Sequence, residues 1–392
     1  MSFVDPGSPD DLLREVRTRF TDAHGREPDV VGRAPGRVNL IGEHTDYNAG
    51  LCLPLALPHA TYAALARRDD DRVRIASSQD ATLWEGSLDA LGPGAVEGWA
   101  TYVAGVLWAL REAGHDLPGL DVLVDGRVPI GAGLSSSAAL ECAVAIGAAH
   151  LLGLGDTEQT RRGLADACIR AESEVAGAPT GGMDQTVALL AQAGTALLID
   201  FDDDTTRAVD LPLAGAGLAV LVTDTKVSHA LVDGGYAARR ADCEAAAEAL
   251  RLPSLRHADQ AAVDTLEDAR VRRRARHVVR EIALVGETVE AIGAGDWARV
   301  GRLFGDSHDS MRDDFEISCD ELDTVVATAV HAGALGARMT GGGFGGSAIS
   351  LVPEERVEAV MRAIDLAFAA AGYRAPAHLR GEPSGPAAVV AS

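Results

Sequence analysis

The sequence predicts an α+β fold of two lobes, in which mixed β-sheets are covered by helices. At 392 residues the chain is longer than one hydrophobic core usually serves. Hydrophobic residues make up 47% of it but aromatic residues only 4%, so the core must consist mainly of Ala, Val, Leu and Ile. Such a core suits layers of helices and strands. Strand and helix patterns indeed follow one another along most of the chain.

The first half of the chain combines both kinds of element. Ser8 to Asp11 can cap an amphipathic helix, and the chain from Val30 to about Leu57 is typical of strands and loops. Periodicity then predicts helices at about 98–114, 135–152 and 158–175, and a strand at 120–128. The first lobe is expected to span 1–205, with the boundary uncertain by about 20 residues.

The second lobe, 206–392, is predicted to be rich in helices, which dominate from about 236 to 333. Two strands, GTALLID and LAVLVTD, lie near the boundary. Five glycines within Gly341–Gly346 separate two extended segments, and a final helix begins near 353. The Pro/Gly/Ala-rich tail, 376–392, is expected to be partly ordered at most.

Charge and cysteine content exclude several classes of protein. A formal charge of -23 repels nucleic acid phosphates and anionic membranes, so we expect neither as a partner. There is no apolar stretch of about 18 residues that could cross a membrane. The five cysteines are widely spaced and form no CxxC pair, which favours reduced thiols in the cytoplasm. We expect a monomer.

A segment rich in glycine and serine joins a predicted strand to a predicted helix. Glycines let the backbone approach a ligand closely, and serines at a helix start add hydroxyls to free N–H groups that attract anions. This favours a phosphate cradle, although an ordinary loop with a helix cap fits the composition equally well. Its residues are Gly131, Ala132, Gly133, Leu134, Ser135, Ser136 and Ser137.

The chain has one lysine, Lys226, which restricts how it can bind phosphate. Neither a Walker A loop nor the paired lysine of a protein kinase is present. Gly341–Gly346 matches GxGxxG but leads into a strand, whereas Gly131–Ser136 has Ser in the third glycine position, so a dehydrogenase is a weak alternative. Phosphate charge must therefore be neutralised by magnesium, helix N-termini and arginine.

Glu172 is a candidate magnesium ligand. Together with a serine of the 135–137 cluster it would give the few protein oxygens that are typical of magnesium-nucleotide sites. An isolated glutamate on a helix more often faces solvent.

Arg37, Glu43, His44 and Asp46 lie within ten residues beside apolar, strand-like positions. Carboxylates accept and His or Arg donate hydrogen bonds to hydroxyl-rich ligands, so this inventory fits a sugar. His44 and Asp46 also form the HxD pair of a facial iron site, but that site needs a distal His in a β-barrel. Asp184 follows two glycines at a predicted helix start, where a helix cap is the alternative role.

Three segments resemble, in order, the three motifs of the galactokinase branch of the GHMP small-molecule kinases. They are GRVNLIGEHTDYNAG, PIGAGLSSSAALE and TGGGFGGSAISLV. The first motif points to galactokinases, whereas the other two are shared among GHMP kinases. The resemblance implies a two-lobed GHMP-kinase-like fold with the active site in the cleft between the lobes. It also implies phosphorylation of the anomeric hydroxyl of galactose by ATP, the first committed step of galactose catabolism.

The resemblance also assigns roles to residues. It implies that Asp184 accepts the proton of the anomeric hydroxyl, while Arg37 orients that carboxylate and stabilises developing charge. ATP would lie on Gly131–Ser137, with Ser137 and Glu172 binding Mg²⁺ and Ser77 on the adenine side. The implied sugar site comprises Arg37, Glu43, His44, Asp46, Gly181, Asp184 and Tyr236.

Other readings of the same residues stay open. A kinase for N-acetylgalactosamine or arabinose would share nearly all of them, and a non-catalytic galactose sensor would keep the fold. Two residues depart from the family pattern: Gly182, where a larger apolar residue is common, and Ala49. They leave room for a different range of sugar substrates. A homoserine or mevalonate kinase has no reason to carry Glu43–Asp46.

Overall fold

Three β-sheets organise the protein in the computed structural model, which describes residues 2–228 and 232–392. The six-stranded sheet has the order β13-β1-β3-β6-β4-β5, the three-stranded sheet β2-β7-β8 and the four-stranded sheet β10-β11-β9-β12. The strands are β1 (Val30–Asn39), β2 (Leu51–Cys52), β3 (Pro54–Arg67), β4 (Arg72–Ser77), β5 (Trp84–Ser87), β6 (Leu120–Gly126), β7 (Thr195–Asp200), β8 (Thr205–Asp210), β9 (Leu218–Ser228), β10 (Gly336–Thr340), β11 (Gly345–Pro353), β12 (Ala377–Arg380) and β13 (Ala388–Ala391).

Helices cover these sheets. They are α1 (Pro9–His24), α2 (Ala100–Glu112), α3 (Ser136–Leu151), α4 (Glu158–Arg170), α5 (Met183–Leu190), α6 (Val232–Leu250), α7 (Gln260–Asp264), α8 (Ala269–Gly293), α9 (Trp297–Ser310), α10 (Asp320–His331) and α11 (Val357–Ala371). Single turns of 3-10 helix occur at Asp46–Asn48, Leu88–Ala90, Leu255–His257 and Glu354–Arg356, and π-helical turns at Ala171–Val175 and Met311–Phe315. No helix in the described part of the chain is long and apolar enough to cross a membrane.

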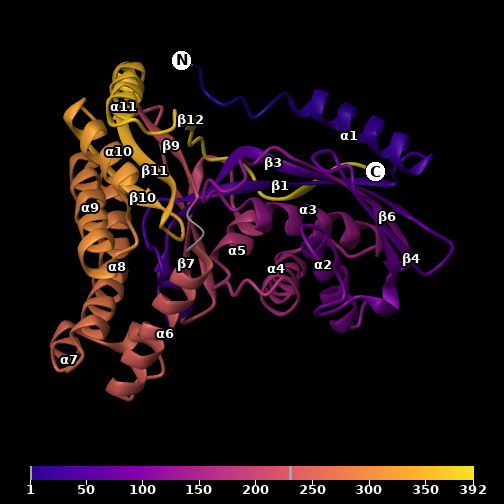
Figure 1. Ribbon diagram of the computed structural model, residues 1–392, viewed down its shortest axis with the longest axis horizontal. Helices are drawn as coiled ribbons and strands as arrows, with labels where there is room; N and C mark the ends of the chain where they lie inside the picture. Colours follow the sequence, from indigo (N-terminus) through magenta and orange to yellow (C-terminus); the bar gives the residue numbers. More distant parts are fainter. Residues whose placement is uncertain (1, 229–231) are drawn as a thin grey trace.

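Helices cover both faces of the six-stranded sheet, whose strands β1, β3 and β6 are almost entirely buried. Figure 1 shows α1 along one face and α2 to α5 along the other. The alternation of side chains in β3 explains this arrangement, because Tyr62 and Ala64 pack with Phe20 of α1, whereas Ala63 and Leu65 pack into the core formed with α2 and α3. Helix α3 is apolar nearly all round and lies within this core.

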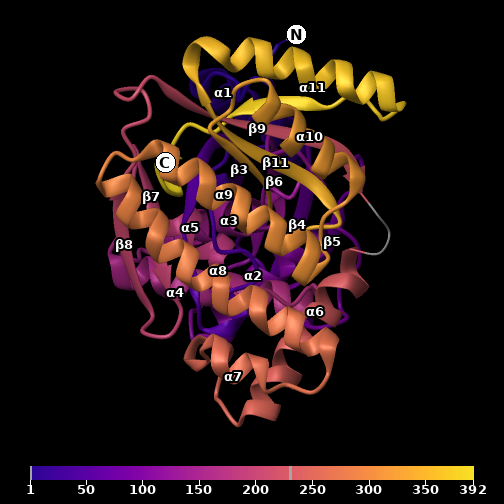
Figure 2. The same cartoon turned by 90° about the vertical axis from the view of Figure 1, so that its left-hand side faces the viewer.

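The four-stranded sheet forms the second lobe together with α8 to α11 (Figures 1 and 2). Helices α10 and α11 bury Val325, Val360 and Phe368 against Ala348 and neighbouring apolar residues of the sheet. Strands β10 and β11 form an antiparallel hairpin; three of the five glycines lie in its loop, and Gly345 and Gly346 begin β11. The predicted α+β, two-lobed architecture is therefore confirmed.

The two ends of the chain correct the predicted organisation. The tail is ordered as β12 and β13, and β13 pairs with β1 of the first lobe, so the second lobe does not extend to residue 392. At the other end, the backbone N–H of Val4 donates to the carbonyl of His378 in β12, at 2.8 Å. A cut between 205 and 206 would fall inside β8, which pairs with β7. A division of the chain into two consecutive ranges cannot represent strands that pair across long distances in the sequence.

Candidate active site

Asp184 is held at the start of α5 by groups from two other elements. Arg37 of β1 donates from Nε to Oδ1 at 2.8 Å and from Nη2 to Oδ2 at 3.1 Å, which is the planar, two-bond geometry that arginine forms with carboxylates. The Ser135 hydroxyl also donates a hydrogen bond to Oδ2. The side chain does not cap α5, whose flanking residue is Gly182, so the helix-cap alternative is wrong. The Asp184 side chain is 21% exposed, which leaves it accessible to a ligand.

The glycine and serine segment enters α3 with its first N–H groups uncapped by side chains. Ser135, the residue before the helix, has φ 60 and ψ 49, and its hydroxyl is directed to Asp184 instead of the helix. The helix cap of the alternative interpretation, an ordinary loop with a cap, is therefore absent. Free N–H groups at a helix start form an anion site. Arg37 Nη1 donates to the Gly133 carbonyl at 2.6 Å, so one guanidinium joins Asp184 to this segment.

The third motif packs directly on the glycine and serine segment. A Cβ atom on Gly341 would lie 2.9 Å from the carbonyl oxygen of Gly133, and one on Gly346 3.2 Å from that of Ala132. Ser347 Oγ donates to the Ala132 carbonyl at 2.7 Å. Glycine is needed here because the two backbones approach more closely than a side chain would allow.

The same hairpin loop holds Glu43 of the first motif. The Gly341 N–H and the Thr340 hydroxyl donate to Glu43 Oε1 at 3.0 and 3.2 Å, and Arg338 donates to Oε2. The Glu43 side chain is 1% exposed. In the structure, the Glu43 carboxylate joins the first motif to the third. Its contact with a sugar stays a prediction.

Neighbouring hydrogen bonds fix the tautomer of His44. Its Nε2 lies 3.1 Å from the Gly342 carbonyl, which can only accept, so Nε2 carries the hydrogen. Nδ1 therefore accepts from the Tyr47 hydroxyl at 2.8 Å. Burial lowers the pKa of His44 to about 3, which keeps the ring neutral. With both nitrogens engaged, His44 is not available to an iron ion, and the facial-triad alternative is wrong.

Asp46 and Gly181 are in contact. A Cβ on Gly181 would lie 2.2 Å from Asp46 Cγ, so only glycine fits beside this carboxylate. Burial and then the charge of Asp184 raise the pKa of Asp46 to about 6. The ring of Tyr236, on α6, lies 5.0 Å from that of His44 between centroids. The predicted sugar residues from three distant segments thus converge on one place.

The two predicted magnesium ligands are neighbours. Ser137 lies close enough to the carboxyl group of Glu172 to lower the pKa of that group, and Glu172 lies in the π-helical turn Ala171–Val175 that follows α4. Such turns occur frequently at functional sites. Burial and the charge of Asp184 raise the pKa of Glu172 to about 7, although Ser137, Gln185 and Arg37 act in the opposite direction. A hydroxyl beside crowded, buried carboxyl groups is a donor set that fits a hard divalent cation.

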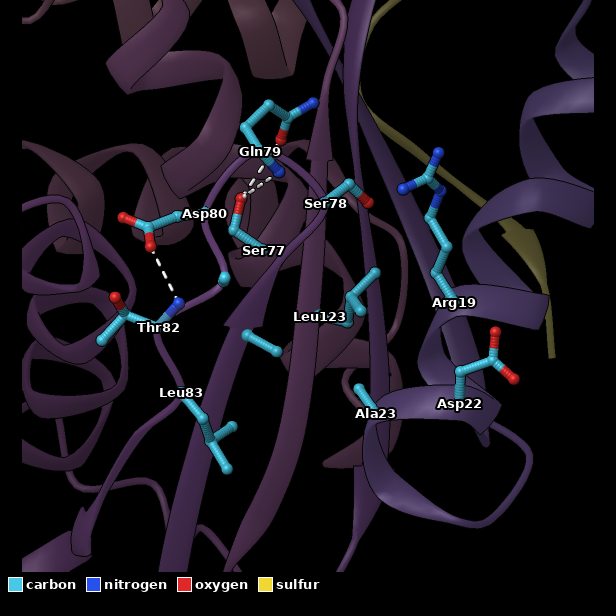
Figure 3. A pocket seen from close by; sticks show the side chains of 12 residues that line it. Arg19, Asp22, Ala23, Ser77, Ser78, Gln79, Asp80, Thr82, Leu83 and Leu123 are labelled. Atoms are coloured by element: carbon cyan, nitrogen blue, oxygen red, sulfur yellow. Dashed lines mark hydrogen bonds between the residues drawn. The ribbon is translucent and has the colours of Figure 1, made fainter.

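Ser77 is the last residue of β4 (Figure 3). Its hydroxyl donates to Gln79 Oε1 at 3.1 Å and accepts from the Gln79 N–H. The residue borders a cavity of about 530 Å³ that is also lined by Arg19 of α1 and Leu123 of β6. Its place beside adenine stays a prediction.

Sequence reasoning missed four buried residues that support the site, namely Arg338, Glu281, Gln185 and Glu141. Arg338 donates to both Glu43 and Glu281, and Gln185 donates to both Glu141 and Glu172. Arg338 and Glu141 could have been recognised in the sequence, because each is a charged residue inside an otherwise apolar segment. Arg338 lies in a fully buried strand, and Glu141 is the only acidic residue of α3.

Gly181→Ala should weaken sugar binding selectively. The new methyl group would displace the Asp46 carboxylate, so we expect the KM for the sugar to rise at least about tenfold, equivalent to about 1.4 kcal/mol. The affinity for nucleotide should not change. Gly163→Ala, at a position of α4 with open space around it, is the matched control for steady-state kinetics. An unchanged sugar KM in Gly181→Ala would refute the close contact.

The fold and this site define a class of small-molecule kinase. The models for the GHMP kinases N terminal domain and the GHMP kinases C terminal match residues 101–192 and 288–370. A mevalonate kinase from Methanococcus jannaschii shares the fold, with a TM-score of 0.66 at 15% identity over 91% of this chain and 98% of that one.

More specific comparisons identify the family. The galactokinase galactose-binding signature matches residues 18–67. A galactokinase from Streptomyces coelicolor is 48% identical over 94% of this chain and 96% of its own length. A Lactococcus lactis galactokinase, solved in complex with galactose, superimposes with a TM-score of 0.91 at 30% identity, over 96% of this chain and 99% of that chain. The chain belongs to the galactokinase family.

Proposed function

We propose that this protein transfers the γ-phosphoryl group of ATP to the anomeric hydroxyl of galactose, which gives galactose 1-phosphate and ADP. The observation that carries the proposal is the position of Asp184. Arg37 and Ser135 hold its carboxylate beside both the anion-binding start of α3 and the cluster formed by Asp46, Gly181 and Tyr236. A nucleotide phosphate on one side and a sugar hydroxyl on the other would meet there.

Two residues would act on the reacting atoms. The anomeric O–H would give its proton to a carboxylate oxygen of Asp184 while the sugar oxygen forms its bond to the γ-phosphorus and the bond to the leaving ADP breaks. Arg37 would keep the carboxylate in its orientation through two hydrogen bonds and stabilise the negative charge that develops nearby. Positioning of this kind is the main requirement of phosphoryl transfer.

ATP would place its phosphates on the uncapped N–H groups at the start of α3, within Gly131–Ser137. Ser137 and Glu172 would hold Mg²⁺, which when bound neutralises charge on the phosphate oxygens. In the described part of the chain, no three His, Cys, Asp or Glu side chains form a metal cluster. Magnesium bound with a nucleotide needs only one or two protein ligands, so two suffice.

A galactose sensor without turnover is the second candidate from another class. The contacts that hold Asp184, and the contact between Ser137 and Glu172, are in place, which favours the enzyme. An ADP-release assay with galactose, its 2-amino derivatives, glucose and arabinose decides the matter. We expect the fastest release with galactose. Release that is no faster with any of these sugars than without sugar would favour the sensor.

We also propose that the protein acts in the cytoplasm as a monomer. The free state of Cys52, Cys142, Cys168, Cys243 and Cys319 supports a reducing compartment. The molecular mass in dilute solution, measured by light scattering, tests the monomer.

The affinity for galactose should fall as the pH decreases through about 6. Asp46, with a pKa raised to about 6, then gains a proton, so one of its oxygens becomes a donor and the group accepts fewer and weaker hydrogen bonds from sugar hydroxyls. Because folding raises this pKa, ionised Asp46 destabilises the free protein above about pH 6, and this cost disappears at lower pH. The KM for galactose should therefore rise toward acid pH while the contribution of Asp46 to unfolding free energy becomes less unfavourable. Asp46→Asn should abolish this transition in a KM-versus-pH profile; its persistence would assign it to another group.

A further inference from the structure

The side-chain amide of Gln185 bridges two buried carboxyl groups behind the proposed nucleotide site. Gln185 Nε2 donates to Glu141 Oε2 at 3.1 Å and also to Glu172 Oε2. Gln185 and Glu141 are both fully buried, with 0% exposure. Gln185 directly follows Asp184 at the start of α5, yet the two side chains have separate sets of partners. The sugar-side and metal-side groups are thus fixed from adjacent positions of one helix.

The orientation of this amide follows from its surroundings. With Nε2 between the two carboxyl groups, both amide hydrogens have acceptors. The reverse orientation would place the amide oxygen against two further oxygen atoms and lose both hydrogen bonds. Gln185 therefore acts as a donor to Glu141 and Glu172.

Two oxygen atoms of this group lack a donor. In the described part of the chain, Glu141 Oε1 and Gln185 Oε1 are both buried without a hydrogen-bond partner. Buried acceptors of this kind are uncommon, because an unsatisfied acceptor destabilises the folded protein. One proton on Glu141 would supply the missing donor and complete a two-bond pair between a carboxylic acid and an amide.

We propose that Glu141 is a positioning residue: as an uncharged carboxylic acid it locks the amide of Gln185, which in turn orients the carboxylate of Glu172 toward magnesium. The role rests on the magnesium site of the proposed function. Groups that hydrogen-bond a metal ligand commonly determine metal affinity, because they fix the orientation of that ligand. Glu141 itself touches neither the sugar nor the phosphates in this account.

Two variants test whether Glu141 acts as a neutral carboxylic acid. Glu141→Gln replaces the acid by an amide that can both donate to Gln185 Oε1 and accept from Nε2, so it reproduces the pattern of a protonated acid. Glu141→Leu has a similar volume but makes neither hydrogen bond. Calorimetry without sugar would measure the Mg²⁺ concentration at which ATP binding is half-maximal. This is a binding measurement, so turnover does not enter it.

We expect Glu141→Leu to raise the required Mg²⁺ concentration by about 10- to 100-fold. Glu141→Gln should keep it near that of the original protein. An unchanged requirement in Glu141→Leu, or an equal rise in both variants, would overturn the proposal. Magnesium-independent ATP binding by the unaltered protein would instead refute the magnesium site of the proposed function.

Infrared spectroscopy tests the proton without metal or nucleotide. The difference spectrum between the unaltered protein and Glu141→Gln at neutral pH should contain the carbonyl band of a protonated carboxylic acid. A carboxylate band in its place would overturn the proposal. Should Glu141→Leu fail to fold, Glu141→Gln decides alone: a retained Mg²⁺ requirement together with the acid band supports the role, and the loss of either refutes it.

Discussion

Asp184→Asn should lower kcat for galactose phosphorylation by about 100- to 10,000-fold, the usual contribution of a group that accepts a proton in the transition state. An amide cannot take up the proton of the sugar hydroxyl, and it presents only one oxygen to Arg37 in place of two. ATP binding should remain measurable, because the start of α3 does not depend on this carboxylate for its N–H groups. Steady-state kinetics and calorimetry with ATP measure the two effects separately.

Asp116→Asn is a suitable control for this variant. Asp116 is exposed, and in the described structure its side chain forms no hydrogen bond or ion pair. The same chemical change should therefore leave kcat unaffected. An Asp184→Asn protein that retains most of its activity would remove Asp184 from the reaction. The loss of ATP binding together with activity would instead indicate a structural role.

Arg338→Met should destabilise the protein by about 3–5 kcal/mol, the cost of removing one partner of a buried ion pair. Arg338 is fully buried and donates to Glu43 and Glu281, so its removal leaves two buried carboxyl groups without their cation. Glu281 also accepts from the Gly42 N–H at 2.9 Å and from Ser307. The damage would therefore spread to the segment that carries the first motif. Urea unfolding measures the change in unfolding free energy.

Arg299→Met is the matched control, because Arg299 pairs with Glu287 at the surface and such pairs contribute about 0–1 kcal/mol. Glu43→Gln in the Arg338→Met background should recover part of the lost stability, since it removes one of the stranded charges. A loss below about 1 kcal/mol in Arg338→Met would contradict the inferred role of the buried ion pair.

The fold class and the residues around Asp184 could be predicted because the chemistry is local in the sequence. Glu43, His44 and Asp46 are close neighbours, and Gly131–Ser137 joins a strand to a helix in an arrangement that itself indicates anion binding. The glycine run Gly341–Gly346 was predicted to separate two extended segments, which are β10 and β11. The contacts of this segment could not be predicted, because those of Gly341 with Gly133 and with Glu43 join parts of the chain that are about 200 and 300 residues apart.

Other features depended on burial, which a single sequence does not reveal. The tail looked too rich in Pro, Gly and Ala to be ordered, yet β13 completes the edge of the first sheet beside β1. Composition reports local preference, whereas pairing with an existing strand edge overrides it. Likewise, Glu141 and Arg338 could be recognised as unusual among apolar neighbours, but their partners became visible only in three dimensions.

A crystal structure of the protein with galactose and a non-hydrolysable ATP analogue tests the central claim most directly. We expect the anomeric oxygen of galactose within hydrogen-bond distance of an Asp184 carboxylate oxygen. The terminal phosphate of the analogue should lie on the opposite side of the anomeric oxygen, near the start of α3. A complex in which another hydroxyl of the sugar, or no hydroxyl at all, lies between Asp184 and the phosphate would contradict it.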